Sequence, residues 1–252
     1  MSQIHARLEG VSLAYGEKRV LVDCNLDIVQ GAITCVIGLS GAGKSTILRL
    51  LNGLRRPTAG RVLVAGRDIA SLAGRELADF RQQIGFAFQF SALFDSLTVF
   101  DNVALPLRET TTLDERAIRG KVETILASVG LTDAAQALPA ELSGGMRKRV
   151  GFARAVIAQP TMVLYDEPTT GLDPVMTRML TDTIRSLQQR DQSTVVVVSH
   201  DRESIYAMAD YIAMIYEGKI LAYGSLEQIR ASTDPYLLQF LHGNPEGPMH
   251  VV

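Results

Sequence analysis

Residues 38–45, with the sequence GLSGAGKS, have the types and the spacing that bind phosphate. Glycines let the backbone turn so that successive N–H groups converge on one point, and the positive end of a following helix favours an anion there. We expect Lys44 to reach the β- and γ-phosphates of a nucleotide and the Ser45 hydroxyl to bind Mg²⁺. The predicted nucleotide contacts are Gly38, Leu39, Ser40, Gly41, Ala42, Gly43, Lys44, Ser45 and Thr46.

An acidic pair follows the apolar residues 162–165 and would complete such a site. Asp166, at the end of a predicted strand, is expected to hold Mg²⁺ opposite Ser45. Glu167 is expected to polarise a water molecule for attack on the γ-phosphate, as a general base. The sequence Asp-Glu-Pro by itself is typical of a surface turn. The apolar run before it, in a chain that also has a phosphate-binding loop, favours the catalytic interpretation.

A second pair of glycines lies in the sequence LSGG at residues 142–145, before a predicted helix. Backbone N–H groups and a helix N-terminus could bind another phosphate here. A single nucleotide does not need two such sites, so the second would serve a partner molecule. The alternative is a plain helix cap, because Ser143 is a good N-cap residue.

The elements that must position these residues alternate between strands and helices, which predicts an α/β protein with a parallel sheet. Residues 90–158 have helical spacing and few β-branched clusters, which predicts a helical insertion. The expected strands are 7–13, 20–22, 26–28, 34–37, 61–64, 84–88, 162–165 and 194–198, and the expected helices are 46–51, 73–82, 113–129, 144–158, 175–190 and 202–209.

Charge and cysteine content limit the classes of function. The chain has 25 Lys and Arg against 27 Asp and Glu, a formal net charge of −2, so we expect no nucleic acid partner. Cys24 and Cys35 are too few for a disulfide framework and lack the spacing of metal ligands, so both are expected to be inert core residues. We find no signal peptide and no apolar run of roughly 18 residues, which predicts a cytosolic protein that does not span a membrane by itself.

The motifs together resemble those of the nucleotide-binding subunits of ATP-binding cassette (ABC) transporters, over roughly residues 6–228. The Gly-Leu-Asp-Pro sequence at 171–174 and His200 also match, in order and spacing. The resemblance implies a P-loop ATPase domain over residues 1–232, with a parallel core sheet, an antiparallel β subdomain and a helical subdomain at about 90–158. It also implies ATP and Mg²⁺ as cofactors, and a head-to-tail dimer with two ATP molecules at the interface.

The resemblance assigns further site residues. Gln89 would sense the metal and the attacking water, and His200 would contact the γ-phosphate. Tyr15 would stack on adenine. Without the resemblance, His200 is typical of a satisfied strand-end residue and Tyr15 of a turn aromatic. The residues expected to contact or couple to the ATP of the other subunit are Ser143, Gly144, Gly145 and Asp173.

Two longer stretches, 88–109 and 142–155, are similar to the ATPases of Mce-associated lipid transporters, including the maintenance-of-lipid-asymmetry (Mla) system. Met146 stands where the family usually has Gln, and Ser91 where we expect Gly. The departure at Met146 is expected to mark a subfamily. The basic residues 147–149 are expected to form a solvated helix face, the alternative being a nucleic-acid patch.

The resemblance therefore implies an ATPase subunit that drives phospholipid transport from the cytoplasmic face of the bacterial inner membrane, bound there through its permease. The expected partners are a second copy of the chain, the permease subunits, an Mce-domain lipid-binding subunit and a small cytoplasmic accessory subunit. Three alternatives remain open at this point. They are the ATPase of an importer for another solute such as amino acids, a soluble ABC protein that acts on ribosomes or DNA, and a regulatory nucleotide binder without turnover.

The C-terminal tail, residues 233–252, is set apart from the ATPase domain. Residues 234–242 place Tyr236, Leu237, Phe240 and Leu241 on one face of a short helix, which must pack on something because so short a helix is not stable alone. Prolines and glycines beyond it favour an extended end. The helix and end either pack on their own domain or cross to the second subunit and steady the dimer.

Overall fold

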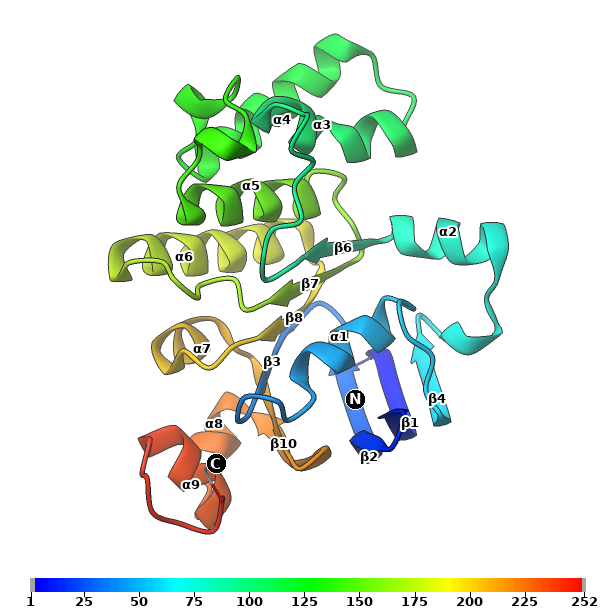
Figure 1. Ribbon diagram of the computed structural model, residues 1–252, viewed down its shortest axis with the longest axis vertical. Helices are drawn as coiled ribbons and strands as arrows, with labels where there is room; N and C mark the ends of the chain where they lie inside the picture. The colour runs from blue at the N-terminus through cyan, green and yellow to red at the C-terminus, as the bar shows by residue number, and fades with distance from the viewer. Residues whose placement is uncertain (1–2, 251–252) are drawn as a thin grey trace.

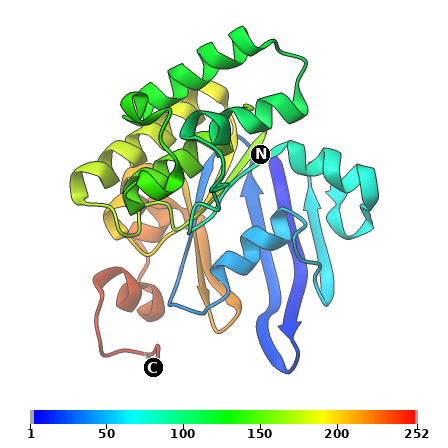
Figure 2. The same ribbon diagram turned by 45° about the horizontal axis from the view of Figure 1, so that its top comes forward.

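The computed structural model describes residues 3–250, which form two β-sheets surrounded by helices (Figures 1 and 2). The larger sheet has the strand order β10-β9-β3-β8-β7-β6, and all neighbouring pairs except β10 and β9 are parallel. Every residue of β3, β7 and β8 is buried, as expected for strands covered on both faces. The six strands are β3 (Ile33–Ile37), β6 (Ile84–Ala87), β7 (Met162–Asp166), β8 (Thr194–Val198), β9 (Tyr211–Tyr216) and β10 (Lys219–Ser225).

The two faces of this sheet belong to two separate hydrophobic clusters. Along β3, Cys35 lies in the cluster that contains the buried side chains of α5 (Gly144–Val156), whereas Val36 lies in the cluster that contains those of α1 (Lys44–Leu51). Successive side chains of a strand point to opposite faces. The helices α1 and α5 therefore cover opposite faces of the sheet. Cys24 and Cys35 are both buried, as predicted.

The smaller sheet is antiparallel and has the order β2-β1-β4-β5. Its strands are β1 (Ile4–Tyr15), β2 (Lys18–Val29), β4 (Ala59–Val64) and β5 (Arg67–Asp68). The prediction of two short strands at 20–22 and 26–28 is wrong, because β2 continues through both. Asp23, between them, has a φ of 49°, and the β1–β2 register is irregular nearby. A β-bulge at Asp23 thus accommodates the polar residues between the two apolar segments, and β2 continues past it.

The chain between β6 and β7 forms helices and no strand, and the predicted helical insertion falls in this region. The helices gather at one end of the molecule, drawn in green at the top of Figure 1. They are α3 (Val99–Thr110), α4 (Glu115–Ser128) and α5, with the short 3₁₀ turns η2 (Thr132–Ala134) and η3 (Pro139–Glu141). With the two sheets, this arrangement confirms the predicted fold class.

Helix α3 was missed by the sequence analysis. Pro106 lies inside it and has no N–H to donate, which usually argues against a helix. Tertiary packing outweighs this cost, because Phe100, Val103 and Leu107 are buried in the cluster that contains α5. The Thr98 side chain caps the helix by accepting a hydrogen bond from the Asp101 N–H at 3.1 Å.

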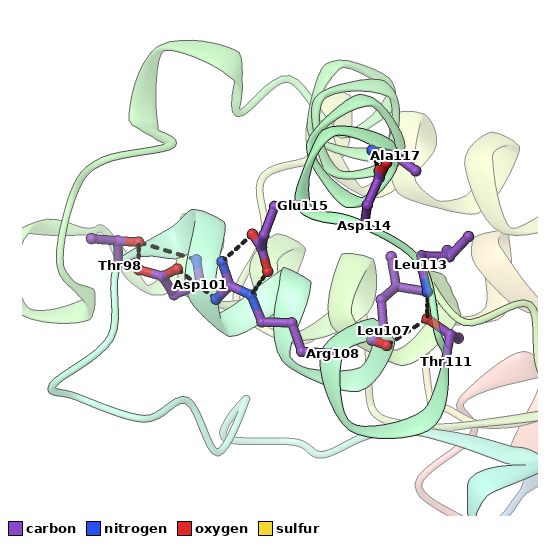
Figure 3. Close-up of polar contacts among 9 residues, drawn as sticks. All are labelled: Thr98, Asp101, Leu107, Arg108, Thr111, Leu113, Asp114, Glu115 and Ala117. Atoms are coloured by element: carbon purple, nitrogen blue, oxygen red, sulfur yellow. Dashed lines mark hydrogen bonds and ion pairs between the residues drawn. The ribbon is translucent and has the colours of Figure 1, made fainter.

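One arginine ties α3 to the start of α4 (Figure 3). The Arg108 guanidinium donates to both carboxylate oxygens of Glu115, at 2.8 and 2.9 Å, and to Asp101 at 2.8 Å. Hydrogen bonds from Arg108 lower the pKa of both carboxyl groups. This fork-shaped contact fixes the turn between the two helices.

The other helices agree with the predicted ranges where a prediction was made. The strand-to-helix connections β8–α7 and β3–α1 place loops at the carboxyl edge of the larger sheet (Figure 1). These helices are α1, α2 (Gly74–Gln82), α6 (Pro174–Asp191) and α7 (Arg202–Met208), together with the unpredicted α8 (Leu226–Arg230) and the 3₁₀ turn η1 (Ile69–Ser71). No helix in residues 3–250 is both long enough and apolar enough to cross a membrane.

The tail packs on its own domain. Helix α9 (Pro235–His242) forms where a short helix was predicted, and Leu237 and Leu241 are buried against the cluster that contains α5. The chain then turns back, so that Met249 is 3% exposed and its backbone exchanges two hydrogen bonds with the Gln239 side chain, at 2.7 and 3.2 Å. Up to residue 250, the structure has the first of the two predicted arrangements. Residues 251–252 lie outside the described part.

Candidate functional site

The phosphate loop, residues 38–45, joins β3 to α1 with a backbone that requires glycine at several positions. Gly41 and Gly43 have φ values of 78° and 107°. At Gly38, with a φ of 148°, a Cβ would lie 2.1 Å from the backbone oxygen of Ile215, so no side chain fits. Gly43 is the N-cap of α1, and the first N–H groups of that helix face the loop. The loop therefore presents an anion-binding concavity.

Lys44 begins α1 and its side chain folds back along the loop. It is buried, and its Nζ atom donates to the backbone oxygens of Gly38 at 2.9 Å and Leu39 at 3.0 Å. Burial lowers the pKa of Lys44, while the nearby Glu167 and Asp166 act in the opposite direction. The cation is thus held at the loop and faces two acidic groups.

Ser45 and Asp166 meet as predicted, although they lie 121 residues apart in the sequence. The Ser45 hydroxyl donates to the Asp166 carboxylate at 2.8 Å. Asp166 ends β7 and is 5% exposed, and burial raises its pKa although the Ser45 hydrogen bond lowers it. A hydroxyl and a buried carboxylate are hard oxygen ligands, and Mg²⁺ is usually bound by one or two protein oxygens, with waters and phosphate completing its shell. The pair fits such an ion.

Glu167 comes directly after β7 and has a φ of 51°, a left-handed backbone that is unusual for this residue type. Its N–H donates to the Val198 oxygen at 2.9 Å. Its carboxylate Oε2 lies 3.0 Å from the Thr170 hydroxyl and 2.8 Å from Nδ1 of His200. Because β7 and β8 are parallel neighbours, Glu167 and His200 leave the sheet at the same edge.

Gln89 follows β6 at this same edge. In the β6–β7 register Ala87 pairs with Tyr165, so Gln89 and Glu167 each lie two residues beyond a paired position. The Gln89 side chain is half-buried, so part of it is accessible to a group that enters the site.

Tyr15 lies beside the phosphate loop. It lines a hollow of about 300 Å³ together with Gly41, Lys44, Ser45 and Thr46. Tyr15 is 39% exposed, and the Arg55 guanidinium lies 5.3 Å from the centroid of its ring. The position is suitable for a planar group next to the phosphates.

Ser143 and Asp173 are not brought to the phosphate loop of the same chain. Ser143 caps α5, which covers the face of the sheet opposite α1, and its hydroxyl accepts from the Met146 N–H at 3.2 Å. Asp173 caps α6 in the same way, through the Met176 N–H at 2.9 Å. Ser143, Gly144 and Asp173 are exposed and Gly145 is half-buried. Within this chain, Ser143 and Asp173 act as helix caps.

The basic residues 147–149, which follow the LSGG sequence, do not form a solvated face throughout. Only Arg147 is exposed. Lys148 is half-buried and donates to the backbone oxygen of Glu167 at 3.0 Å, and Arg149 donates to that of Val129 at 2.6 Å. Burial lowers the pKa of Lys148 and of Arg149. The prediction of a solvated face is therefore wrong for Lys148 and Arg149, which are half-buried and bind backbone carbonyls of distant segments.

The two departures from the family pattern have local explanations. Met146 is half-buried and packs against the cluster that contains α5, a role in which an apolar side chain serves better than an amide. Ser91 has a φ of 63°, in the region that favours glycine, and is buried beside Gly151. Its backbone oxygen accepts from Arg154 at 2.7 Å. The backbone thus keeps a conformation suited to glycine although serine occupies it.

Sequence reasoning missed two residues that touch Glu167. Thr170 lies three residues after Glu167 on the same loop, and this short separation could have suggested a hydrogen bond from its hydroxyl to the Glu167 carboxylate. Lys148 lies 19 residues before Glu167, and no local pattern indicates the contact.

Comparisons with known proteins agree with these motifs. A family model described as "ABC transporter" matches residues 21–170. The chain is 40% identical to "Intermembrane phospholipid transport system ATP-binding protein MlaF" of Haemophilus influenzae, over 99% of this chain and 94% of the relative, and 38% identical to the MlaF of Escherichia coli, over 96% and 90%. It is also 38% identical to "Probable ribonucleotide transport ATP-binding protein mkl" of Mycobacterium leprae, over 96% and 70%.

Among solved structures, the chain is similar to the dimeric ATP-binding cassette MJ0796 in a post-hydrolysis state bound to ADP and Pi. The TM-score is 0.82 and the identity 31%, over 88% of this chain and 98% of that one. A second dimeric structure of MJ0796, described as a bacterial ABC transporter cassette, has a TM-score of 0.83 at 32% identity, with the same coverage.

Proposed function

The chain belongs to the ABC transporter family, and from this premise we propose that it is the ATP-hydrolysing subunit of a phospholipid transporter. The observation that carries the ATPase assignment is the assembly of four side chains at one edge of the larger sheet. These are Ser45, which ends the phosphate loop, and Asp166, Glu167 and His200, which follow or end neighbouring strands. The similarity to two MlaF proteins, which are named for intermembrane phospholipid transport, supports the lipid as cargo.

In this proposal the loop binds the phosphates of ATP and Lys44 exchanges its two backbone partners for phosphate oxygens. Ser45 and Asp166 would hold Mg²⁺, with Gln89 close by. When bound, the ion supplies positive charge that stabilises the phosphates as their charge redistributes. Tyr15 would stack on the adenine.

Glu167 would act as the general base. Its carboxylate is directed by Thr170 and His200, and it would accept a proton from the water that attacks the γ-phosphate. His200 is 60% exposed at its side chain, whereas the Glu167 side chain is only 10% exposed. The imidazole is therefore open to the γ-phosphate while it holds the carboxylate.

A second copy of the chain would complete each site. Ser143, Gly144 and Gly145 of one copy would contact the γ-phosphate bound to the other, and Asp173 would lie near the interface. The dimeric MJ0796 structures, and the exposure of Ser143 on the opposite face of the sheet from α1, support a head-to-tail arrangement.

The similarity to the two MlaF proteins also suggests the membrane partners. We propose that the chain binds permease subunits at the cytoplasmic face of the inner membrane and acts with an Mce-domain lipid-binding subunit and a small accessory subunit. Closure of the dimer on ATP would move the permease, and hydrolysis would reopen it. No nucleic acid partner is proposed, since acidic and basic residues nearly balance.

Ribonucleotide transport is a second candidate, because the mkl relative is named for it. Co-purified chain and permease, reconstituted in liposomes, would separate the two. We expect ATP-dependent transfer of a fluorescent phospholipid, blocked by Glu167→Gln, and no ATP-dependent movement of a radiolabelled ribonucleotide. Ribonucleotide movement without lipid transfer would overturn the phospholipid assignment and leave the ATPase assignment intact.

A further inference from the structure

Glu167 has an unusual backbone that something must hold in place. Its φ of 51° is left-handed, and Pro168 follows it, which further restricts the conformations open to Glu167. Residues in such conformations persist only when their surroundings over-determine them, and they cluster at functional sites. The position of the Glu167 carboxylate therefore depends on the contacts that hold the Glu167 backbone, as well as on the groups that touch the carboxylate itself.

Three groups from outside its own loop contact Glu167. The Val198 oxygen accepts from its N–H at 2.9 Å, His200 lies 2.8 Å from its carboxylate, and the Lys148 ammonium donates to its backbone oxygen at 3.0 Å. The first two come from β8 and the residues that follow it. Lys148 comes from α5, and its hydrogen bond to the Glu167 oxygen restrains the orientation of the Glu167–Pro168 peptide.

The neighbouring turn of α5 also touches this loop. A Cβ on Gly145 would lie 3.0 Å from Cδ2 of Leu172, so the helix backbone packs closely against the loop that begins at Glu167. The start of α5 therefore contacts residues 167–172 at both ends, through Lys148 at one and Gly145 at the other. The hydrogen bond from Lys148 lies beside this packed contact and is partly buried.

The charge of Lys148 suits this place. Burial lowers the pKa of Lys148, whereas the negative charges of Glu167 and Asp166 raise it. The ammonium therefore lies close enough to interact electrostatically with both carboxylates. The three arginines of the same helix likewise donate to backbone oxygens, but these oxygens belong to residues 142, 129, 130 and 91, outside the loop of residues 167–172. Among the basic residues of α5, Lys148 is the one directed at the site.

We propose that Lys148 is a positioning residue for ATP hydrolysis, which acts by holding the Glu167 peptide so that the carboxylate faces the attacking water. The inference rests on the proposed ATPase function and on Glu167 as its general base. Loss of the hydrogen bond would let the peptide relax, and small misplacements of a catalytic group lower the rate strongly. Binding of ATP would be nearly unaffected, because Lys148 donates to a backbone oxygen of this chain and not to the phosphate loop.

The test uses the complex of chain and permease, with Lys148→Met to remove the donor and keep the apolar stem, and Lys148→Arg to keep a cationic donor. Lys121→Met, an exposed position on α4, is the matched control. We expect Lys148→Met to lower kcat by roughly 10- to 100-fold with KM for ATP within about twofold of wild type. Lys148→Arg should recover most of that rate.

A double-variant cycle separates positioning from a merely structural role. If Lys148 acts through Glu167, then adding Lys148→Met to Glu167→Gln should lower the residual rate by less than about twofold, because residues that act as a unit are non-additive. An undiminished rate in Lys148→Met, or the same fold-loss in both backgrounds, would overturn the inference. No ATPase activity in the wild-type complex would instead contradict the proposed function, so the two failures are distinguishable.

Discussion

The Nδ1 atom of His200 lies 2.8 Å from the Oε2 atom of Glu167, across the carboxyl ends of two neighbouring parallel strands. Thr170 donates to the same oxygen at 3.0 Å. Together they hold the carboxylate of a residue whose side chain is 10% exposed, beside a phosphate loop that carries a buried lysine. The site therefore combines a positioned carboxylate with a cation at the phosphate loop.

Lys44→Ala should weaken ATP binding itself, since it removes the buried cation at the loop. A hydrogen bond to a charged group is worth about 1.5–3 kcal/mol, or roughly 10- to 150-fold in Kd. Titration of a fluorescent ATP analogue onto the purified chain would measure the change. Lys121→Met, on the surface of α4, should bind as wild type, and equal Kd values for both variants would contradict a phosphate role for Lys44.

Mixing two inactive variants tests the composite site. In a dimer of one Lys44→Ala chain and one Ser143→Arg chain, a head-to-tail interface places both lesions in one site and leaves the other intact. Partial ATPase activity should therefore return on mixing. If mixed dimers form, as shown by co-purification of two affinity tags, and turnover stays absent, then Ser143 does not act across the interface.

Arg108 should stabilise the α3–α4 connection in a way that depends on pH. Its hydrogen bonds lower the pKa of Asp101 and Glu115, so the stabilisation is present above the unfolded-state pKa values, near 4, and is lost as the pH falls through the lower folded-state values. We expect Arg108→Met to lower the free energy of unfolding only slightly at pH 7, since the pair with Asp101 is partly exposed and the Glu115 side chain is mostly exposed, so that solvent screens both.

The measurement is the difference in urea-unfolding free energy between wild type and Arg108→Met, at pH 7 and at the lowest pH at which both still fold. The difference should shrink towards acid pH and with added salt. Arg116→Met, at an exposed position next to Glu115, is the control and should show neither trend. A pH-independent difference for Arg108→Met would argue that the side chain acts by packing alone.

Deletion of residues 243–252 should leave a folded but less stable chain. It removes the buried Met249 and leaves the Gln239 amide, itself 3% exposed, without its two backbone partners. Loss of one buried apolar side chain costs about 1.5–3 kcal/mol, and exchange of the two Gln239 hydrogen bonds for bonds to water adds about 1 kcal/mol, so we expect a loss of about 2–4 kcal/mol, mostly at α9. Thermal unfolding should show a lower Tm. An unchanged Tm, with dimer assembly impaired, would favour instead the alternative in which the end crosses to the second copy.

Part of the fold and of the site could be predicted from the sequence, because the residues that determine each feature lie close together along the chain. The phosphate loop depends on its own glycines and on the helix that follows, and Asp166 and Glu167 depend on the strand just before them. The parallel strands then bring Asp166 and His200 to one edge. Gly171 and Asp173 likewise belong to one short loop before α6.

Other features depend on contacts between distant residues and were missed or mispredicted. Helix α3 forms in spite of Pro106 because of the core that its apolar side chains share with α4 and α5. Strand β2 passes through Asp23 because β1 pairs with both halves and a bulge absorbs the difference. The hydrogen bond from Lys148 to the Glu167 oxygen can form only after α5 has packed beside β7. The pattern of apolar residues within one segment does not predict contacts of this kind.

The role of Glu167 as general base is tested by the steady-state ATPase rate of the purified complex with Glu167→Gln, with ATP affinity determined in parallel. The amide keeps the shape of the side chain and its contacts with Thr170 and His200, but cannot accept the proton from water. We predict a rate about 10²- to 10⁴-fold below wild type, with ATP affinity retained and a closed dimer that accumulates. Glu123→Gln, at an exposed position of α4, should have no effect. Turnover near the wild-type rate in Glu167→Gln would show that Glu167 is not the general base and would contradict the account.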